Sequence, residues 1–470
     1  MTNDLQYLFY PRSIALVGIS TNPAKFGGGF WMNVLLELGY SGKIYPVNPK
    51  LDEFNGIKVY PTVRDIPESV DLVIVTIPAH LTIQLMEDCA YKGVKFVQFY
   101  TAGFSETGEE EGIKMEKELL KIAKRGGIRI IGPNCMGVYC PKSGICWRYD
   151  FPKKSGPLGI MAQSGWNAVE IVKLGAIHGV LCSELISYGN ASDLNESDFL
   201  EYFASDSETK VVASYIEGVK NGRRFFSILS KVSKIKPYIV LKGGRTDAGT
   251  RAVASHTSSL AGTNEIWNAV IKQSGAIGVS SFDELIDTVI ACLYMKVPKN
   301  RKVGLIGSGG GPSVTAADEC ESSGLQVPPF PDSIRQNLNK FMPKEGTSSK
   351  NPIDSPFVWD PDMFGKTIRT VAECTEIGSL IVHAEIDSTV LFVGRKLIAQ
   401  ITQSIIDNAK KCGKPVAFVL RSVGTPEAKQ VLQEEQEKFL KQGLPLYPSI
   451  SRASKAIDNL IEYNRRLQEE

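Results

Sequence analysis

Short apolar runs rich in β-branched residues alternate with longer amphipathic stretches along nearly the whole chain. The first runs lie at residues 13–18, 43–47 and 71–77, and helix-like stretches lie at 28–39 and 80–92. Strands that alternate with helices are typical of parallel sheets whose helical crossovers cover both faces. The pattern therefore predicts an α/β protein, and its 470 residues are too many for one ordinary core.

The pattern falls into three blocks, and we predict one domain for each: residues 1–143, 144–298 and 299–470. The first block is predicted to form a Rossmann-like sheet, with further strands at 95–100 and 128–131. The other two blocks are predicted to form flavodoxin-like doubly wound domains. Their expected strands lie at 158–162, 181–187, 211–216, 238–242, 276–279, 302–306, 379–384, 415–420 and 444–447.

Two segments have a different composition. Residues 243–263 are rich in Gly, Ser and Thr and are predicted to form a loop. The residues from 450 onward are rich in charge and predict a terminal helix with a solvated face.

Composition excludes several classes of function. The net charge of +2 gives no reason to expect a nucleic acid or a membrane surface as partner, and no apolar run reaches the ~18 residues that span a bilayer. The nine cysteines form no CxxC pair, which favours a reducing cytoplasmic location. The four histidines are isolated from one another and lie at no familiar zinc spacing, so we expect no metal site in this chain.

A glycine-bearing turn follows the first predicted strand. The strand ends at Gly18, and Gly27 opens the next helix, whose free N–H groups suit a phosphate. Lys25 in the turn and Lys50 after the second strand suit a ribose phosphate and count against NAD, which calls for a carboxylate there. NADP and coenzyme A remain open, as does a tight turn that binds nothing.

The ends of neighbouring strands are expected to face the same crevice, because ligands bind at the carboxyl ends of parallel strands. Cys135 lies there too, but with no histidine nearby in sequence we interpret it as a packing residue rather than a nucleophile. The predicted crevice residues are Gly18, Ser20, Lys25, Phe26, Gly27, Asn48, Pro49, Lys50, Ile77, Pro78, Thr101, Ala102, Gly103, Phe104 and Asn134.

An ordered set of motifs runs through the three blocks: LVGIS, KFGG, YPVNPK, TIPA, YTAGF, GPNCMG, QSG, YIEG, SHT followed by LAG, and GSGGG. In this order the chain resembles the α subunits of NDP-forming acetyl-CoA synthetases, relatives of succinyl-CoA synthetase. The resemblance implies a coenzyme-A-binding domain, a phosphohistidine-bearing domain and a third ligase domain. It also implies a separate ATP-grasp β subunit that holds ADP or ATP with Mg²⁺, in an α2β2 heterotetramer.

His256 is the phosphate carrier that the resemblance implies. Small and hydroxylated residues surround it, and a neutral imidazole is a competent nucleophile toward an acyl phosphate. Taken alone, it is also compatible with a surface histidine. Glu217, at the end of a predicted strand, matches the glutamate that bonds the phosphohistidine in succinyl-CoA synthetase. Glu184, Glu170 and an ordinary exposed role for Glu217 are the alternatives.

Two helix starts are predicted to hold the phosphate, because free N–H groups gather at such positions. They comprise Gln163, Ser164 and Gly165 in the second block and Ser308, Gly309, Gly310 and Gly311 in the third. Two roles remain open for Asn351 and Asp354, which either line this site or form a turn. We expect Trp31, Trp147, Trp166 and Trp267 in the core or an interface, with an acyl-pocket role for Trp166 as a weaker alternative.

The resemblance, together with these features, implies a ligase subunit that interconverts acyl-CoA, phosphate and ADP with acid, CoA and ATP through an acyl phosphate and a phosphohistidine. Two alternatives are a CoA-responsive regulatory protein without catalysis and an NADP-dependent oxidoreductase. The sequence does not reveal the acyl group, the choice between ADP and GDP, or the direction of the reaction.

Overall fold

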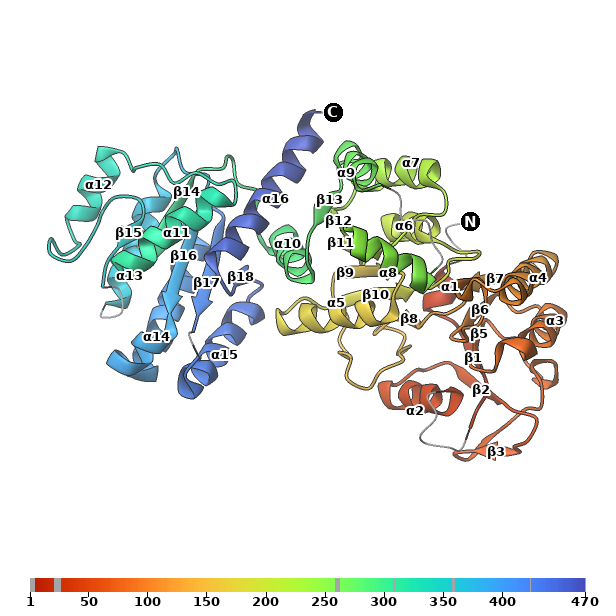
Figure 1. The fold of residues 1–470 in the computed structure, drawn as a ribbon. Coiled ribbons are helices and arrows are strands. Elements are labelled where there is room, and N and C mark those ends of the chain that lie inside the picture. Colours follow the sequence, from red (N-terminus) through yellow and green to blue (C-terminus); the bar gives the residue numbers. More distant parts are fainter. Residues whose placement is uncertain are drawn as a thin grey trace. The chain divides into compact units, whose positions relative to one another are not determined.

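The computed structural model describes residues 5–20, 27–257, 263–307, 309–356, 360–422 and 424–469. The chain divides into two compact units, Met1–Phe282 and Asp283–Glu470, and each is described by itself. Among the described residues, the first unit contains two large sheets and the second contains one (Figure 1). All three are doubly wound, as predicted.

The first sheet is fully parallel, in the order β2-β1-β5-β6-β7. Leaving aside a small hairpin of β3 (Glu53–Phe54) and β4 (Ile57–Lys58), this is a 2-1-3-4-5 order whose switch point lies between β1 and β5. The main elements are β1 (Ser13–Val17), α2 (Gly28–Leu38), β2 (Lys43–Val47), β5 (Leu72–Val75), α3 (Thr82–Lys92), β6 (Phe96–Phe99), α4 (Glu110–Gly126) and β7 (Arg129–Ile131), preceded by α1 (Gln6–Phe9).

The second sheet repeats this order and adds one antiparallel edge strand, β8 (Gly137–Tyr139), which pairs with β10. The sequence pattern missed β8, because three residues are too few to show a period. Helix α5 lies on one face of the sheet, and α6 and α7 lie on the other (Figure 1). The elements are β9 (Leu158–Ala162), α5 (Gly165–Ile177), β10 (Cys182–Ser187), α6 (Glu196–Ser205), β11 (Val211–Ile216), α7 (Gly222–Val232), β12 (Tyr238–Lys242), α8 (Asp247–Thr257), α9 (Asn264–Gln273) and β13 (Ile277–Val279).

The predicted loop at 243–263 is wrong for residues 247–257, because α8 occupies Asp247–Thr257. Thr246 Oγ1 accepts a hydrogen bond from the Gly249 N–H at 3.1 Å, in the manner of an N-cap. Asp247 lies in the first turn, where a negative charge favours a helix, and alanines at 248, 252 and 254 favour its continuation. In the sequence, the glycines and hydroxyl residues of this segment favoured the loop prediction over these helix-favouring residues.

The third sheet is parallel, again with 2-1-3-4-5 connectivity: β15-β14-β16-β17-β18. Helix α11 packs beside α16, while α13, α14 and α15 pack against one another in succession. The elements are α10 (Phe282–Tyr294), β14 (Val303–Gly307), α11 (Gly310–Ser322), α12 (Asp332–Asn339), β15 (Ile353–Asp354), α13 (Pro361–Ala372), β16 (Ser379–Glu385), α14 (Ile386–Lys411), β17 (Val416–Arg421), α15 (Pro426–Lys441), β18 (Leu446–Tyr447) and α16 (Ile450–Glu469).

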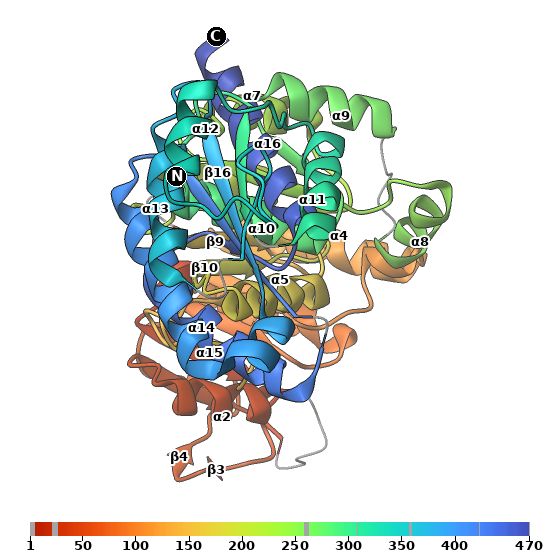
Figure 2. The ribbon, with the colours of Figure 1, turned by 90° about the vertical axis from the view of Figure 1, so that its left-hand side faces the viewer.

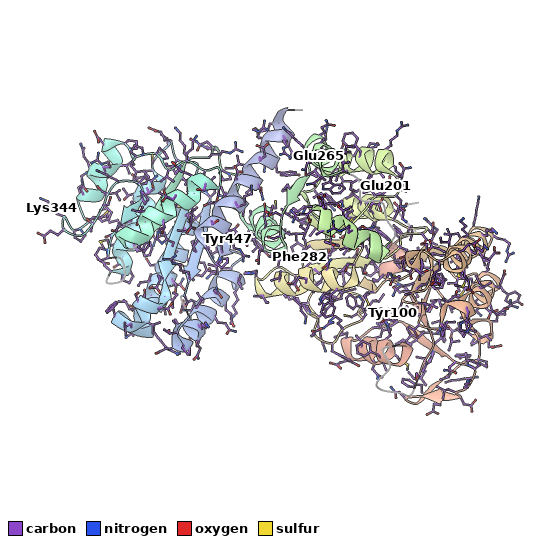
Figure 3. All side chains as sticks on the ribbon, in the orientation of Figure 1. Tyr100, Glu201, Glu265, Phe282, Lys344 and Tyr447 are labelled. Atoms are coloured by element: carbon purple, nitrogen blue, oxygen red, sulfur yellow. The ribbon has the colours of Figure 1, made fainter. Side chains whose placement is uncertain are left out.

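The terminal helix α16 is more than a solvated face. Arg452 donates to both carboxylate oxygens of Asp287 on α10, at 2.6 and 2.9 Å. Arg301 donates to Asp458 at 2.7 Å and to Glu462 at 3.0 Å. The charges of α16 therefore fasten it to its own unit. Tyr447 on β18 is fully buried in the same unit (Figure 3).

Within the described residues, no helix is both long and apolar enough to cross a membrane.

One acidic side chain lies inside the second sheet rather than at its edge. Glu184 on β10 is fully buried and accepts a hydrogen bond from Tyr202 Oη at 3.1 Å. Burial raises the pKa of the Glu184 carboxyl to about 7. The Glu184 side chain lies in the middle of β10, away from the strand end, and its surroundings are determined by core packing.

We expect this carboxyl to make stability depend on pH. Its folded pKa lies above the unfolded value, so its contribution is complete below pH ~4.5 and is lost as pH rises toward ~7, by up to about 3 kcal/mol. A Glu184→Gln variant should therefore gain stability relative to wild type between pH 5 and 8, as measured by urea unfolding. Glu170→Gln, on the exposed face of α5, is the control. A Glu184→Gln difference that stays constant with pH contradicts this account.

Candidate active site

A seam joins the carboxyl edges of the first two sheets. The loop after β10 donates backbone hydrogen bonds across it, from Asn190 to the Pro133 carbonyl, from Ser192 to Gly132 and from Leu194 to Ile130, at 3.0–3.2 Å. Asp193 accepts two hydrogen bonds from the Arg129 guanidinium, at 2.9 and 3.0 Å, and a third from the Ile130 N–H at 2.8 Å. The crevice of the first sheet and the helix starts of the second therefore lie in one rigid frame.

The start of α2 lies against the end of β1 in the first crevice. Gly18 has φ +100°, and a Cβ there would lie 2.6 Å from Thr76 Oγ1, so both conformation and space require glycine. Thr76 Oγ1 accepts the Gly28 N–H at 3.0 Å and donates to the Val17 carbonyl at 2.9 Å. This threonine, which follows β5, fixes the glycine turn at the topological switch point.

Side chains from neighbouring strand ends close the crevice. Asn48 donates through Nδ2 to the Ile19 carbonyl at 2.6 Å, while Thr101 Oγ1 donates to the Ile77 carbonyl at 2.7 Å. The Asn134 N–H donates to the Thr101 carbonyl at 3.0 Å. Tyr100 directly follows β6 at this edge (Figure 3). The structure thus brings together the strand ends that the sequence assigned to one crevice.

The remaining crevice residues differ in exposure. Pro49, Lys50, Pro78 and Ala102 are exposed, whereas Phe104 is fully buried and packs edge-on against Phe99. Ser20, Gly27 and Gly103 lie on the turns themselves, and Gly103 donates its N–H to Glu106 at 2.6 Å. Lys25 and Phe26 lie outside the described residues. Cys135 is buried, and burial raises its thiol pKa well above the ordinary value, which supports the packing interpretation.

The Gln163–Ser164–Gly165 turn begins α5 at the end of β9. Ser164 is the N-cap, and its hydroxyl accepts the Asn167 N–H at 3.4 Å. Gln163 is buried, and its Oε1 accepts the N–H groups of Glu217 and of Gly218, the latter at 2.9 Å. The amide of Gln163 therefore ties the start of α5 to the turn that carries Glu217.

Glu217 lies at the end of β11 and is only 5% exposed, so the ordinary exposed role is wrong. Tyr215 Oη donates to its Oε1 at 3.3 Å, and burial together with this carboxylate raises the pKa of Tyr215 above its usual value. The two alternatives lie elsewhere: Glu184 is inside the sheet, and Glu170 is on the exposed face of α5. Only Glu217 shares a hydrogen-bonded cluster with Gln163.

Lys242 supports the same cluster from the end of β12. Its Nζ donates to the Glu217 carbonyl at 2.7 Å and to the Gly243 carbonyl, and the side chain is buried. Burial lowers the pKa of the Lys242 ammonium below its usual value. This lysine connects the Glu217 turn to the segment that leads into α8. The sequence did not identify Lys242 as part of the site, because a lysine at a strand end is commonly solvated.

His256 belongs to the last turn of α8, and its side chain is outside the described residues. Helix α8 packs beside the 3₁₀ turn η3 (Ser105–Thr107), which leads from the crevice into α4 (Figure 2). The segment that carries His256 therefore lies next to the rim of the first crevice and begins at the base of the Glu217 cluster.

The glycine-rich start of α11 lies in the second unit. Asp354 Oδ1 already accepts the Gly309 N–H at 2.6 Å, and Ser308 lies outside the described residues. The Asn351 side chain hydrogen-bonds to backbone groups, including the carbonyls of Val303 and Pro328, both at 2.8 Å, which is a structural role. His383 is buried against Gly307, and burial lowers its pKa to about 4.

The tryptophans divide into two groups. Trp31 and Trp147 are fully buried, as predicted, and Trp267 stacks on Phe225. Trp166, the residue after Gly165, is instead 74% exposed at the start of α5. A large apolar side chain in this position lies at the mouth of the candidate site.

We expect Lys242→Met to lower stability by about 2–4 kcal/mol, because one buried and one partly buried carbonyl lose their common donor. The midpoint of thermal unfolding measures this. Lys231→Met on the exposed side of α7 is the matched control. If the two variants unfold at the same temperature, Lys242 does not hold the cluster together.

Comparisons with known proteins agree with this geometry. Residues 12–141 match a family model described as a CoA binding domain, and residues 155–292 match the succinyl-CoA ligase like flavodoxin domain. The chain is 35% identical to the Acetate–CoA ligase [ADP-forming] I subunit alpha of Pyrococcus furiosus, with 98% of each chain covered. It is 36% identical to the corresponding II subunit alpha, with 94% of each covered.

A solved structure is similar over the same length. The dinucleotide forming Acetyl-coenzyme A synthetase 1 of Ca. Korarchaeum cryptofilum, in complex with phosphate and ADP, matches with a TM-score of 0.86 and 32% identity, covering 99% of this chain and 98% of that one. Neither the regulatory nor the oxidoreductase alternative is favoured by these matches. The chain therefore belongs to the ADP-forming acetate–CoA ligase α subunits, a family of acyl-CoA synthetases related to succinyl-CoA ligase.

Proposed function

We propose that this chain catalyses the acyl-CoA half of an ADP-forming acyl-CoA synthetase reaction, with His256 as the phosphate carrier. The observation that carries the proposal is the shared frame of the first unit. The seam fixes the coenzyme-A-type crevice relative to the start of α5, and the Glu217 cluster leads into the helix that bears His256.

The chemistry proceeds in three steps. Phosphate attacks the thioester carbon, the C–S bond breaks, and an acyl phosphate and CoA form. The His256 imidazole then attacks phosphorus, which releases the carboxylate and leaves phosphohistidine. Transfer of the phosphoryl group to ADP regenerates histidine and completes the reaction, and every step is reversible.

Positioning and fixed dipoles supply the catalysis in this proposal. The first-turn N–H groups of α5, next to Ser164 and Gly165, hold the phosphate. Glu217 accepts a hydrogen bond from the imidazole and stabilises its developing positive charge. Gln163 and Lys242 keep the Glu217 turn in place through backbone contacts. The start of α11, with Gly310 and Gly311, lies in the second unit and stays a predicted phosphate-binding turn of that unit.

We assign nucleotide binding to a partner. Relatives named as alpha subunits support this assignment, as does the longer Acetate–CoA ligase [ADP-forming] II of Archaeoglobus fulgidus, of which the chain covers 67%. The partner is proposed to be an ATP-grasp β subunit in an α2β2 heterotetramer, with Mg²⁺ on the nucleotide. We further propose domain boundaries near residues 143 and 298 and a cytoplasmic location.

The central test is phosphorylation of the full-length chain by acetyl-CoA and radioactive phosphate, with and without the partner. Wild type should acquire an acid-labile, base-stable label. His256→Ala should abolish this label, and Glu217→Gln should lower the rate of labelling by roughly a hundredfold. His178→Ala, at the opposite end of α5 from Ser164, should label like wild type. Label that persists in His256→Ala refutes the assignment.

A further inference from the structure

Met136 connects the two halves of the candidate site. It lies two residues after Asn134, on the loop that leaves β7. Its N–H donates to Ser187 Oγ of the second sheet at 3.3 Å, and its carbonyl accepts from Gln98 Nε2 of the first sheet at 3.2 Å. The backbone of Met136 is therefore held from both sheets at once, and its side chain has a defined starting point.

The side chain of Met136 covers the start of α5. A Cβ at position 165 would lie 2.2 Å from Met136 Cγ and 3.6 Å from its Sδ, so glycine at 165 leaves the room that this side chain occupies. Met136 is only partly buried. It thus presents an apolar thioether surface beside the turn that is proposed to hold phosphate.

If the proposed function is correct, the acyl group must lie beside Met136. The coenzyme binds at the strand ends of the first sheet, while the attacking phosphate is held at the start of α5. The thioester carbon must lie between them, with its acyl substituent against whatever side chain spans the gap. Met136 spans it, and the exposed indole of Trp166 follows Gly165 at the same helix start.

We propose that Met136 is the specificity-determining residue of the acyl pocket and limits the size of the acyl group. The substrates are short acids with an apolar substituent, because a thioether offers van der Waals contact and no hydrogen bond to a second carboxylate. This inference rests on the proposed function and adds the substrate class to it. In hydrophobic pockets, one methylene changes discrimination by roughly 10- to 200-fold.

The experiment measures the rate of phosphohistidine formation from acetyl-CoA, isobutyryl-CoA, phenylacetyl-CoA and succinyl-CoA with phosphate. Met136→Ala should raise the rate ratio of isobutyryl-CoA to acetyl-CoA by roughly tenfold or more, and Met136→Phe should lower it. Succinyl-CoA should remain a poor donor in every variant. Met115→Ala, a partly buried methionine on α4, is the matched control and should leave the ratios unchanged.

The outcomes separate the two proposals. If wild type forms no phosphohistidine from any acyl-CoA, the proposed function fails. If wild type is labelled but Met136→Ala changes all rates in parallel, with the ratios within about twofold, the specificity role of Met136 is refuted. Coenzyme A affinity, measured by calorimetry, should stay within about twofold of wild type in Met136→Ala. A large loss of that affinity in Met136→Ala likewise refutes the inference, because it makes Met136 part of the cofactor site.

Discussion

The seam between the first two sheets is the constraint on which the site depends. It includes three backbone hydrogen bonds and the bidentate pair of Arg129 with Asp193. Bonds of this kind fix direction as well as distance, because both the donor and the acceptor belong to ordered backbone or to a planar fork. Without the seam, each sheet would keep its own crevice, but the proposed binding sites for the thioester and the phosphate would not be held in a fixed geometry.

Within this frame, the charge of Lys242 has a structural role and is not assigned to the phosphate. The buried ammonium of Lys242 is directed at two carbonyls and holds the base of the segment that leads to α8. In the proposed mechanism, helix N–H groups hold the phosphate, and they bind an anion without the strong attraction that would prevent its transfer. A carrier that must pass phosphate onward benefits from a grip of this moderate strength.

Much of this arrangement was predictable from sequence. Largely buried parallel strands contain apolar runs, so β2, β9, β11 and β12 were predicted to the residue. Helix α8 was missed because its glycine and hydroxyl residues resemble a loop, although its cap and alanines favour a helix. The choice of Glu217 over Glu184 came from its strand-end position and the resemblance; both residues are buried, and their different hydrogen-bond partners become evident only in three dimensions.

Other parts of the site have no local signal. The contact of Met136 with Gly165 joins residues from different sheets, and the bond of Asp354 to Gly309 joins two strand ends that are 45 residues apart. Neither pair has a spacing that sequence periodicity reports. The same holds for Thr76, which fixes the glycine turn from another strand.

The central claim is that the first crevice and the start of α5 act on one thioester. A crystal structure with acetyl-CoA and phosphate tests this most directly. We predict that the coenzyme lies along the strand ends near Asn48 and Thr101, that phosphate lies at the N–H groups after Ser164, and that the thioester carbon lies between them beside Met136. A coenzyme whose thioester points away from the start of α5, with phosphate bound elsewhere, would contradict the account.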